Sequence, residues 1–356
     1  MLFKGARDAP IETERLMASV IGFDIGGAHL KAARAIDGRI VEVLLLPCNP
    51  HYGLARLEAA IEEAVARLGA ADRFAVTMTA ELSDAFETRA AGVAAIASAV
   101  ARRVKGAETL FYAGEGGFLP FAEVRGAAQA IASANWRASA ELVARRLPEA
   151  LFIDMGSTTT DLVPISGGRV GALGGGDAER LANGELVYTG FSRGDPLAGV
   201  TLAPFAGRWT PPARENFATM ADVRRVTGDL VAEDAEPTAD GRGKSVAESI
   251  ARLARLAGRD AAEASPAQWR AFADFLARAQ MRSIEDQIAL LRSRAAMAEG
   301  APIVGAGVGR ALVARLALAE GRAYRDIADL IDSVPEVATA AADCAPACAV
   351  ALLASG

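Results

Sequence analysis

Apolar residues in this chain alternate between short runs with the period of a strand and longer stretches with the period of a helix. Short apolar runs bounded by glycine or proline are typical of strands, and apolar positions three and four apart are typical of helices. Two strand-like runs flank Asp37-Gly38, a strong signal for a hairpin. In the first half, the pattern predicts strands over 20–25, 31–36, 39–46, 74–78 and 109–113, and helices over 54–68, 85–104 and 127–147.

The second half of the chain repeats the order of strand, loop and hairpin strand. A repeat on this scale predicts an α/β protein with two similar domains that face a central cleft. Residues 189–244 interrupt the repeat with several prolines and glycines, and only 220–227 has a helical pattern, which is typical of a functional loop or lid. In this half, the pattern predicts strands over 151–155, 161–165 and 169–173, a strand and turn over 302–309, and helices over 245–256, 266–294, 309–318 and 337–353.

The length of the chain also favours two domains, because 356 residues exceed the size at which one hydrophobic core usually keeps growing. Residues 1–17 are polar without an apolar period, so we expect a disordered extension there. We expect an N-terminal domain over 18–148 and a C-terminal domain over 149–356. Within the second, 189–244 would form an irregular lid insertion, and the last helix would pack back toward the first domain.

Composition narrows the class of protein. The hydrophobic fraction of 52% is inflated by alanine, and no run approaches the roughly 20 apolar residues that a membrane span requires. A net charge of −6 argues against nucleic acid as a partner, and three cysteines are too few for a disulfide framework. We therefore expect a cytoplasmic protein that binds neither nucleic acid nor membrane. The loops described next predict a small phosphate-bearing molecule as substrate, and the sequence is also compatible with a homodimer.

Two segments look like a duplicated phosphate loop. The first reads VIGFDIGGAHLK from Val20 and the second reads LFIDMGSTTTDL from Leu151, and each has an apolar run that ends in Asp, one apolar residue and Gly. Such a glycine lets successive amide groups point at one anion, while the carboxylate holds a cation opposite it. A single copy is more often a plain hairpin turn, but two copies at equivalent places favour a shared phosphate site. The predicted phosphate-binding residues are Gly26, Gly27, Gly156, Ser157, Thr158, Thr159 and Asp161.

A third glycine-rich turn lies near the C-terminus. Gly305, Gly307 and Gly309 follow an apolar strand and open a predicted helix, which is the context in which a nucleotide or another phosphate-bearing ligand approaches a helix N-terminus. The same glycines could equally serve close packing of the helix on its neighbours. The spacing alone leaves both interpretations open.

These three elements, in this order, resemble the superfamily of sugar kinases, actin and Hsp70, whose two ribonuclease H-like domains bind ATP in a cleft. Further segments resemble the hydantoinase/oxoprolinase-related family linked to tetrahydromethanopterin-dependent one-carbon transfer, over nearly all of the chain after Met17. Its archaeal members resemble a methanofuran-biosynthesis synthase that joins an aminomethylfuran diphosphate to γ-glutamyltyramine. The segments are residues 77–82 (TMTAEL), 114–117 (GEGG), 134–136 (ANW), 154–161 (DMGSTTTD), 217–223 (FATMADV) and 304–309 (VGAGVG).

This resemblance implies a transferase in which a phenol oxygen displaces diphosphate from a furanylmethyl carbon. Asp24 and Asp154 would then hold Mg²⁺ and act in catalysis, and Lys31 would neutralise the charge of the leaving group. Glu81 and His29 are the two candidates for the general base. For Arg193, together with the glycines of the third turn, we expect contacts with a nucleotide or with the substrate.

Two other functions fit the same loops. One is an ATP-dependent enzyme, either a kinase or a hydantoinase-like hydrolase, in which the loops hold ATP. The other is a protein without catalytic activity that senses nucleotides or assists assembly. The sequence does not show whether ATP is a ligand.

Overall fold

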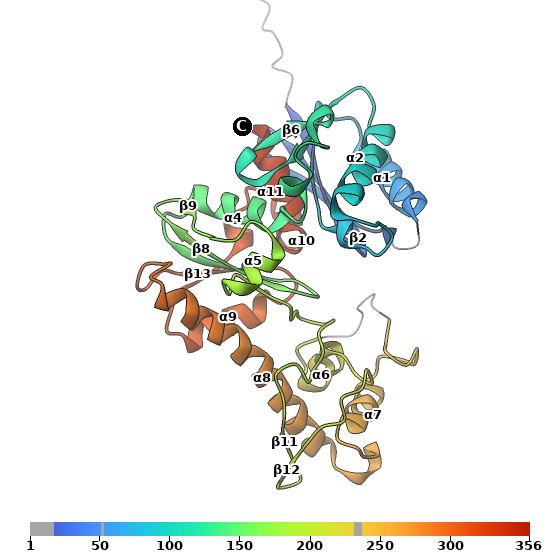
Figure 1. The fold of residues 1–356 in the computed structure, drawn as a ribbon, viewed down its shortest axis with the longest axis vertical. Coiled ribbons are helices and arrows are strands. Elements are labelled where there is room, and N and C mark those ends of the chain that lie inside the picture. The colour runs from blue at the N-terminus through green and yellow to red at the C-terminus, as the bar shows by residue number, and fades with distance from the viewer. Residues whose placement is uncertain (1–17, 51–52, 231–236) are drawn as a thin grey trace, which may run out of the picture.

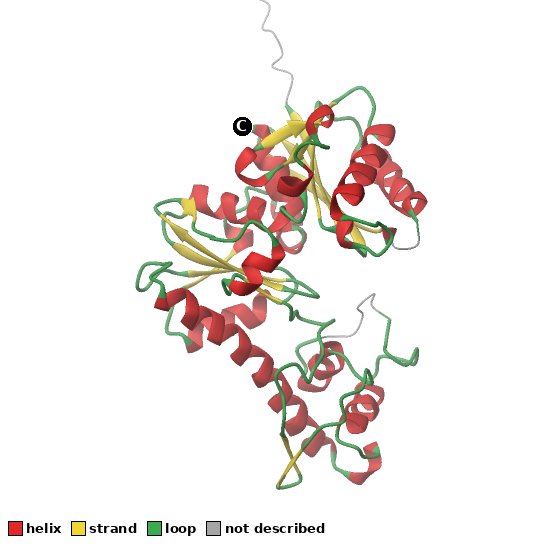
Figure 2. Ribbon diagram, viewed as in Figure 1, coloured by secondary structure: helices red, strands yellow, loops and turns green. Residues whose placement is uncertain are grey.

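The structure is a computed structural model that describes residues 18–50, 53–230 and 237–356. The predicted disordered extension, residues 1–17, lies outside the described residues. Two sheets, each covered by helices, form the body of the molecule, and a mainly helical unit extends from it (Figures 1 and 2). The predicted α/β class with two similar domains is confirmed by the strand order of these sheets.

In the first sheet, β1 lies between an antiparallel hairpin and two parallel strands. The strand order is β3-β2-β1-β4-β5-β6, and helices α1 (Leu54–Leu68) and α2 (Arg89–Arg103) cover one face through a shared apolar core. The predicted Asp37-Gly38 hairpin is confirmed, since both residues have positive φ values between β2 and β3. The strands are β1 (Ser19–Ile25), β2 (His29–Ile36), β3 (Arg39–Pro47), β4 (Arg73–Met78), β5 (Glu108–Tyr112) and β6 (Phe118–Pro120).

The second sheet has the same central topology. Its order is β10-β8-β7-β13-β14, in which β7 pairs with antiparallel β8 on one side and with parallel β13 on the other, as β1 pairs with β2 and β4. Helix α9 (Arg310–Ala319) and the second half of α8 (Pro266–Ser293) pack on one face of this sheet. The strands are β7 (Ala150–Met155), β8 (Thr160–Ser166), β9 (Arg169–Val170), β10 (Leu186–Val187), β13 (Ile303–Ala306) and β14 (Tyr324–Asp326).

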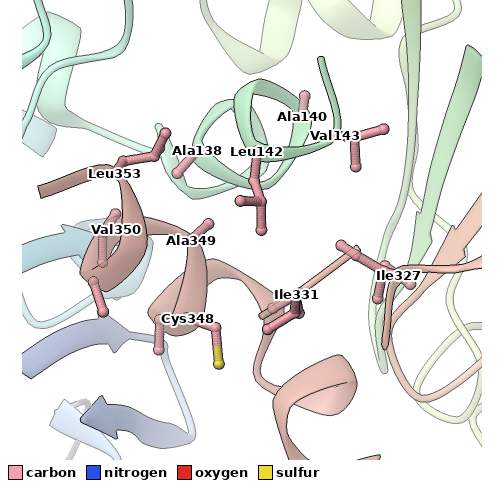
Figure 3. Close-up of a cluster of buried hydrophobic side chains, with 14 of the residues drawn as sticks. Ala138, Ala140, Leu142, Val143, Ile327, Ile331, Cys348, Ala349, Val350 and Leu353 are labelled. Carbon is pink, nitrogen blue, oxygen red and sulfur yellow. The ribbon is translucent and has the colours of Figure 1, made fainter. Parts of the chain in front are cut away.

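Two helices fill the space between the sheets. Helix α11 (Ala345–Ser355) packs on β1 and β2, and α4 (Asn135–Arg146) packs on β7, β8 and β9. The two helices also contact each other, so both sheets share one core, to which α4 contributes Ala138 and Leu142 and α11 contributes Ala349 and Leu353 (Figure 3). The last helix therefore lies against the first sheet, although it follows the second sheet in sequence.

The segment after residue 189 belongs to a unit with its own apolar core. This core joins Leu197 and Phe205 to residues of α6, α7 and the first half of α8, such as Trp269, and extends beyond the predicted lid boundary at 244. Helix α6 matches the predicted 220–227 helix. Figure 1 shows α8 connecting this unit to the second sheet. Its elements are β11 (Ala203–Phe205), β12 (Arg208–Thr210), α6 (Met220–Thr227) and α7 (Val246–Leu256).

Two predicted helices are wrong as continuous elements. The 127–147 helix divides into α3 (Ala128–Ile131) and α4, because Ser133 between them has a φ of +53°. The 337–353 helix divides into α10 (Ala338–Asp343) and α11, which meet at a bend of 112°. Apolar spacing continues through both breaks, so the periodicity carried no sign of them.

Within the described residues, no single helix has the length and apolar character needed to cross a membrane. One bent pair, Pro335–Asp343 with Ala345–Ser355, passes on length and composition. Its second member is α11, most of which is buried between the sheets.

The closest approach of α11 to β1 generates a stability prediction. A Cβ on Gly22 would lie 2.1 Å from the Ala347 carbonyl oxygen, so Gly22→Ala must displace backbone. We expect urea unfolding to show a loss of about 1–3 kcal/mol for this variant. Gly126→Ala is the control, since its Cβ would make only an ordinary 3.6 Å contact and should change stability by less than about 0.5 kcal/mol. Equal stability of the two variants would contradict this account of the interface.

Candidate active site

A cleft of about 650 Å³ lies at the carboxyl ends of β1 and β7, and residues from both sheets line it. Ligands bind at this edge in open α/β sheets. The structure brings most of the predicted site residues together here. Those that line the cleft are Asp24, Gly26, Gly27, His29, Lys31, Asp154, Gly156, Ser157, Thr158, Thr159, Asp161 and Arg193.

The two Asp-x-Gly loops have the same backbone geometry. Each connects an antiparallel pair of strands, and in each the glycine amide donates to the carbonyl oxygen three residues later. Gly26 N–H bonds His29 O at 3.0 Å, and Gly156 N–H bonds Thr159 O at 3.0 Å. Each aspartate is the second-to-last residue of its strand, so the repeat seen in the sequence is also a repeat of position and shape.

The side chain opposite each aspartate differs. Asp24 pairs across the hairpin with Lys31, whose Nζ lies 3.3 Å from Asp24 Oδ2. Asp154 occupies the same place in the second hairpin but faces Asp161. Burial and then the Asp161 carboxylate raise the pKa of Asp154 to about 7. The first loop is therefore neutralised within its own hairpin, and the second carries an excess of negative charge.

Lys31 and Arg180 are the cations that balance this charge. Burial acts to lower the pKa of Lys31, but Asp24 and other groups that include Asp154 raise it further, so the ammonium stays charged. Arg180, in α5 (Asp177–Ala182), binds Asp161 at 2.8 Å and lies 3.8 Å over the Trp136 ring. Sequence reasoning missed Arg180, because it lies in a different element from its partner Asp161.

Asp24 has an unused oxygen. Its Oδ2 is occupied by Lys31, whereas Oδ1 is buried and has no hydrogen-bond partner among the described residues. An unsatisfied buried carboxylate oxygen is costly unless a ligand meets it. Oxygen atoms of this kind are the ligands that Mg²⁺ prefers, and Mg²⁺ commonly takes one or two carboxylates plus substrate phosphate and water.

The start of the inserted unit, residues 190–193, packs against the second Asp-x-Gly loop. Phe191 N–H donates to Gly156 O at 2.8 Å, and Arg193 N–H donates to Ser157 O at 2.9 Å. A Cβ on Gly190 would lie 2.5 Å from Ser157 backbone atoms, so only glycine allows this approach. This backbone contact places Arg193 at the rim of the cleft, next to the second loop.

The third glycine turn packs against protein. A Cβ on Gly305 would lie 2.7 Å from the Tyr324 ring, and one on Gly309 would lie 2.3 Å from Met155. Gly307 has a φ of +77°, and a Cβ there would lie 2.4 Å from Asp154 Oδ1. These glycines are not among the residues that line the cleft. Of the two interpretations left open by the sequence, close packing describes what the turn does in this structure.

Glu81 does not face the cleft directly. Its expected position after β4 is right, but it lies in the 3₁₀ helix Ala80–Leu82, is 2% exposed, and is not a lining residue. Burial raises its pKa to about 7, and a 2.7 Å hydrogen bond from Ser133 Oγ to Oε1 opposes this rise. Ser133 does line the cleft.

One ion pair crosses between the halves of the molecule beside the cleft. Arg89, in α2 of the first domain, binds Asp177 of α5 at 2.9 Å, and Asp177 lines the cleft. Neither residue had a signal in the sequence, because each is an ordinary charged residue on a helix. The pair is a direct contact between α2 of the first domain and α5 beside the cleft.

Comparison with known proteins identifies the family of this chain. The family model described as Hydantoinase/oxoprolinase matches residues 72–354. The chain belongs to the hydantoinase/oxoprolinase family. The match begins at the strand β4, so it leaves out the first Asp-x-Gly loop and includes the second. The matched region therefore includes α2, the second sheet and the inserted unit.

Two curated relatives of this family member bear the same name, (4-{4-[2-(gamma-L-glutamylamino)ethyl]phenoxymethyl}furan-2-yl)methanamine synthase. The protein from Methanocaldococcus jannaschii is 30% identical over 240 residues, which cover 67% of this chain and 71% of the relative. The protein from Methanococcus vannielii is 33% identical over 120 residues, which cover 33% of this chain and 53% of the relative.

Solved structures are similar at low identity. The component A of (R)-2-hydroxyglutaryl-CoA dehydratase from Acidaminococcus fermentans is 12% identical, with 94% of this chain and 96% of that one covered and a TM-score of 0.44. The ROK hexokinase from Thermus thermophilus is 17% identical, with 94% and 97% covered and a TM-score of 0.41. The fold assignment rests on the strand order of the two sheets.

The buried Glu81 carboxyl makes stability depend on pH. Its folded pKa of about 7 lies above the unfolded value of about 4.3, so the folded state holds a proton that the unfolded state has lost. The contribution of Glu81 to the unfolding free energy should therefore fall as pH rises from about 4 to 7 and then level off. Glu81→Gln removes this loss, so its stability relative to the natural protein should rise by roughly 1–3 kcal/mol between pH 4.5 and 7.5.

Urea unfolding at each pH measures this difference. Glu87→Gln, at an exposed position a few residues away, is the matched control and should show a small difference that does not change with pH. A Glu81→Gln difference that stays constant over the range would show that Glu81 is ionised at ordinary pH in the folded protein.

Proposed function

We propose that this protein is a transferase in the biosynthesis of a methanofuran-type one-carbon carrier. It joins a furanylmethyl diphosphate to a γ-glutamyltyramine-like phenol and releases diphosphate. The observation that carries the proposal is the 30% identity, over two thirds of this chain, to a synthase whose name describes a phenoxymethyl-furan product. Such a product contains an ether bond between a phenol oxygen and the methylene carbon of a furan.

The geometry of the cleft supports a diphosphate leaving group. Two loops whose glycines line the cleft lie at the ends of β1 and β7, and the second also offers the hydroxyls of Ser157, Thr158 and Thr159. Lys31 remains charged between the two aspartates and would balance the charge that builds up as the carbon–oxygen bond to diphosphate breaks. Arg193 at the rim suits the glutamyl carboxylate of the acceptor.

The residues present fit a divalent cation. Asp24 Oδ1 and the Asp154 carboxylate would hold Mg²⁺ together with phosphate oxygens and water. When bound, Mg²⁺ would supply Lewis-acid stabilisation of the departing diphosphate. Such a cation would also balance the negative charge of the second loop, where Asp154 faces Asp161 and Arg180 binds Asp161.

An ATP-dependent kinase or hydrolase is the alternative that uses the same loops. The structure offers it less support, because the third glycine turn is filled by Tyr324, Met155 and Asp154 side chains and backbone. A nucleotide-sensing protein without catalytic activity is the third reading. A cytoplasmic location, the lack of nucleic-acid and membrane partners, and a homodimer stay predictions from the sequence.

Two parallel assays test the proposal. Purified protein is incubated with Mg²⁺ and ATP in one, and with Mg²⁺, an aminomethylfuran diphosphate and γ-glutamyltyramine in the other. We expect diphosphate and the ether product in the second assay and no ATP turnover in the first. ATP turnover without ether formation would replace the synthase with the ATP-dependent enzyme, and inactivity in both would favour the sensing protein.

A pair of substitutions tests the shared site. Asp24→Asn and Asp154→Asn should each lower kcat at least about 100-fold, because each removes charge that holds the diphosphate and its cation. The melting temperature of Asp154→Asn should stay near that of the natural protein, whereas Asp24→Asn also breaks the buried ion pair with Lys31 and should melt at a lower temperature. Asp84→Asn is the matched control, since Asp84 lines the same cleft but belongs to neither loop and should keep most activity. Full turnover in either loop variant would remove that aspartate from the mechanism.

A further inference from the structure

A buried carboxyl group lies directly behind one wall of the cleft. Glu81 is 2% exposed, and helix α2 closes off its far side, since a Cβ on Gly92 would lie 2.9 Å from Glu81 Cα and Cβ. Its Oε2 atom is buried without a hydrogen-bond partner among the described residues. A buried carboxyl group with unused acceptor capacity lowers the stability of the fold.

Ser133 connects this carboxyl group with the cleft. Its hydroxyl donates to Glu81 Oε1 at 2.7 Å, and Ser133 itself lines the cleft. Its φ of +53° lies in the left-handed region, which costs a non-glycine residue about 1–2 kcal/mol. The adjacent Ala132 bridges to Met78 at the end of β4, so the break between α3 and α4 is held at the strand end that leads to Glu81. Backbone strain of this kind gathers at functional sites.

We propose that Ser133 and Glu81 form a proton relay that deprotonates the phenol of the acceptor. This rests on the synthase function proposed above. The phenol proton passes to Ser133 Oγ as the Ser133 hydroxyl proton passes to Glu81 Oε1. The phenol oxygen forms the new bond to the furanylmethyl carbon, and the bond from that carbon to diphosphate breaks with its electron pair on diphosphate. Glu81 ends the reaction protonated and returns the proton to solvent.

The surroundings of Glu81 suit it to this role. Arg89 of α2 is the charged group that acts on Glu81 within the described part of the chain, and it favours the ionised form. Burial outweighs Arg89 and raises the pKa of Glu81 to about 7, so the group is partly ionised at neutral pH and is a stronger base than an exposed glutamate. Arg89 also binds Asp177 of α5 at 2.9 Å.

This arrangement also separates two tasks. Asp24 and Asp154 lie at the loop ends, where they would hold the diphosphate and its cation. Glu81 instead connects to the cleft through its hydrogen bond with Ser133. His29, the other predicted base, lies in the first loop, where its carbonyl closes the turn. A base on a separate wall can act on the acceptor without competing for the phosphate site.

The test uses two acceptors that differ in the acidity of the phenol. One is γ-glutamyltyramine and the other carries two fluorine atoms ortho to the phenol oxygen, which makes the phenol more acidic. With the first acceptor, Glu81→Gln should lose about 100-fold or more in kcat. With the fluorinated acceptor at pH 8.5, the loss should shrink to less than about tenfold.

Ser133→Gly separates the relay from folding. Glycine adopts the left-handed conformation of Ser133 without strain, which offsets the loss of the hydrogen bond to Glu81, so the melting temperature should stay near that of the natural protein. Its activity should nevertheless fall with the ordinary acceptor and recover with the fluorinated one, as for Glu81→Gln. Glu87→Gln, with the same chemical change at an exposed position, should leave activity with both acceptors unchanged.

The outcomes distinguish this relay from the function it rests on. A natural protein that forms no ether product would overturn the proposed function itself. A natural protein that is active, with variants that lose nothing or lose equal activity with both acceptors, would leave the synthase in place and overturn the relay.

Discussion

The packing of α11 between the two sheets is the contact on which the rest of the structure depends. Gly22 lets β1 approach the backbone of α11 at a distance that no side chain would permit, and α4 completes the layer against the second sheet. Because interiors are close-packed, this shared core sets the relative position of the sheets with little freedom. The ends of β1 and β7 then meet at one cleft, and two loops distant in sequence become one site.

The two Asp-x-Gly loops have the same backbone shape but carry different charges. Both loops have the same glycine-to-carbonyl hydrogen bond, but the residue opposite the aspartate is Lys31 in one hairpin and Asp161 in the other. Arg180 reaches Asp161 from α5 and leaves Asp154 with a raised pKa of about 7. Carboxylates held close at low exposure favour a bound cation or proton, so the asymmetry prepares the second loop for a positively charged or phosphate-bridging ligand.

The third glycine turn and Glu81 show how far local motifs can mislead about contact with a ligand. Gly307 has the positive φ expected of a ligand-binding turn, yet the space beside it is taken by Asp154, so the turn supports the carboxylate from behind. Glu81 follows a strand at the predicted edge but turns inward, and Ser133 takes the place on the cleft wall. In both cases a residue that we expected to line the cleft lies behind it and contacts a lining residue: Gly307 contacts Asp154, and Glu81 bonds Ser133.

Local pattern accounts for the hairpins, most helices, the doubled loops and the α/β class, because periodicity and turn residues act between neighbours in the chain. Pro346, in the first turn of α11, was a local sign of the bend before that helix. The break at Ser133, the partner of Asp161 and the burial of Glu81 were invisible to the local pattern. Each depends on contacts between segments far apart in sequence. The amino-acid sequence alone thus defined the two halves of the site, while long-range packing established which of its groups face the cleft and which stand behind it.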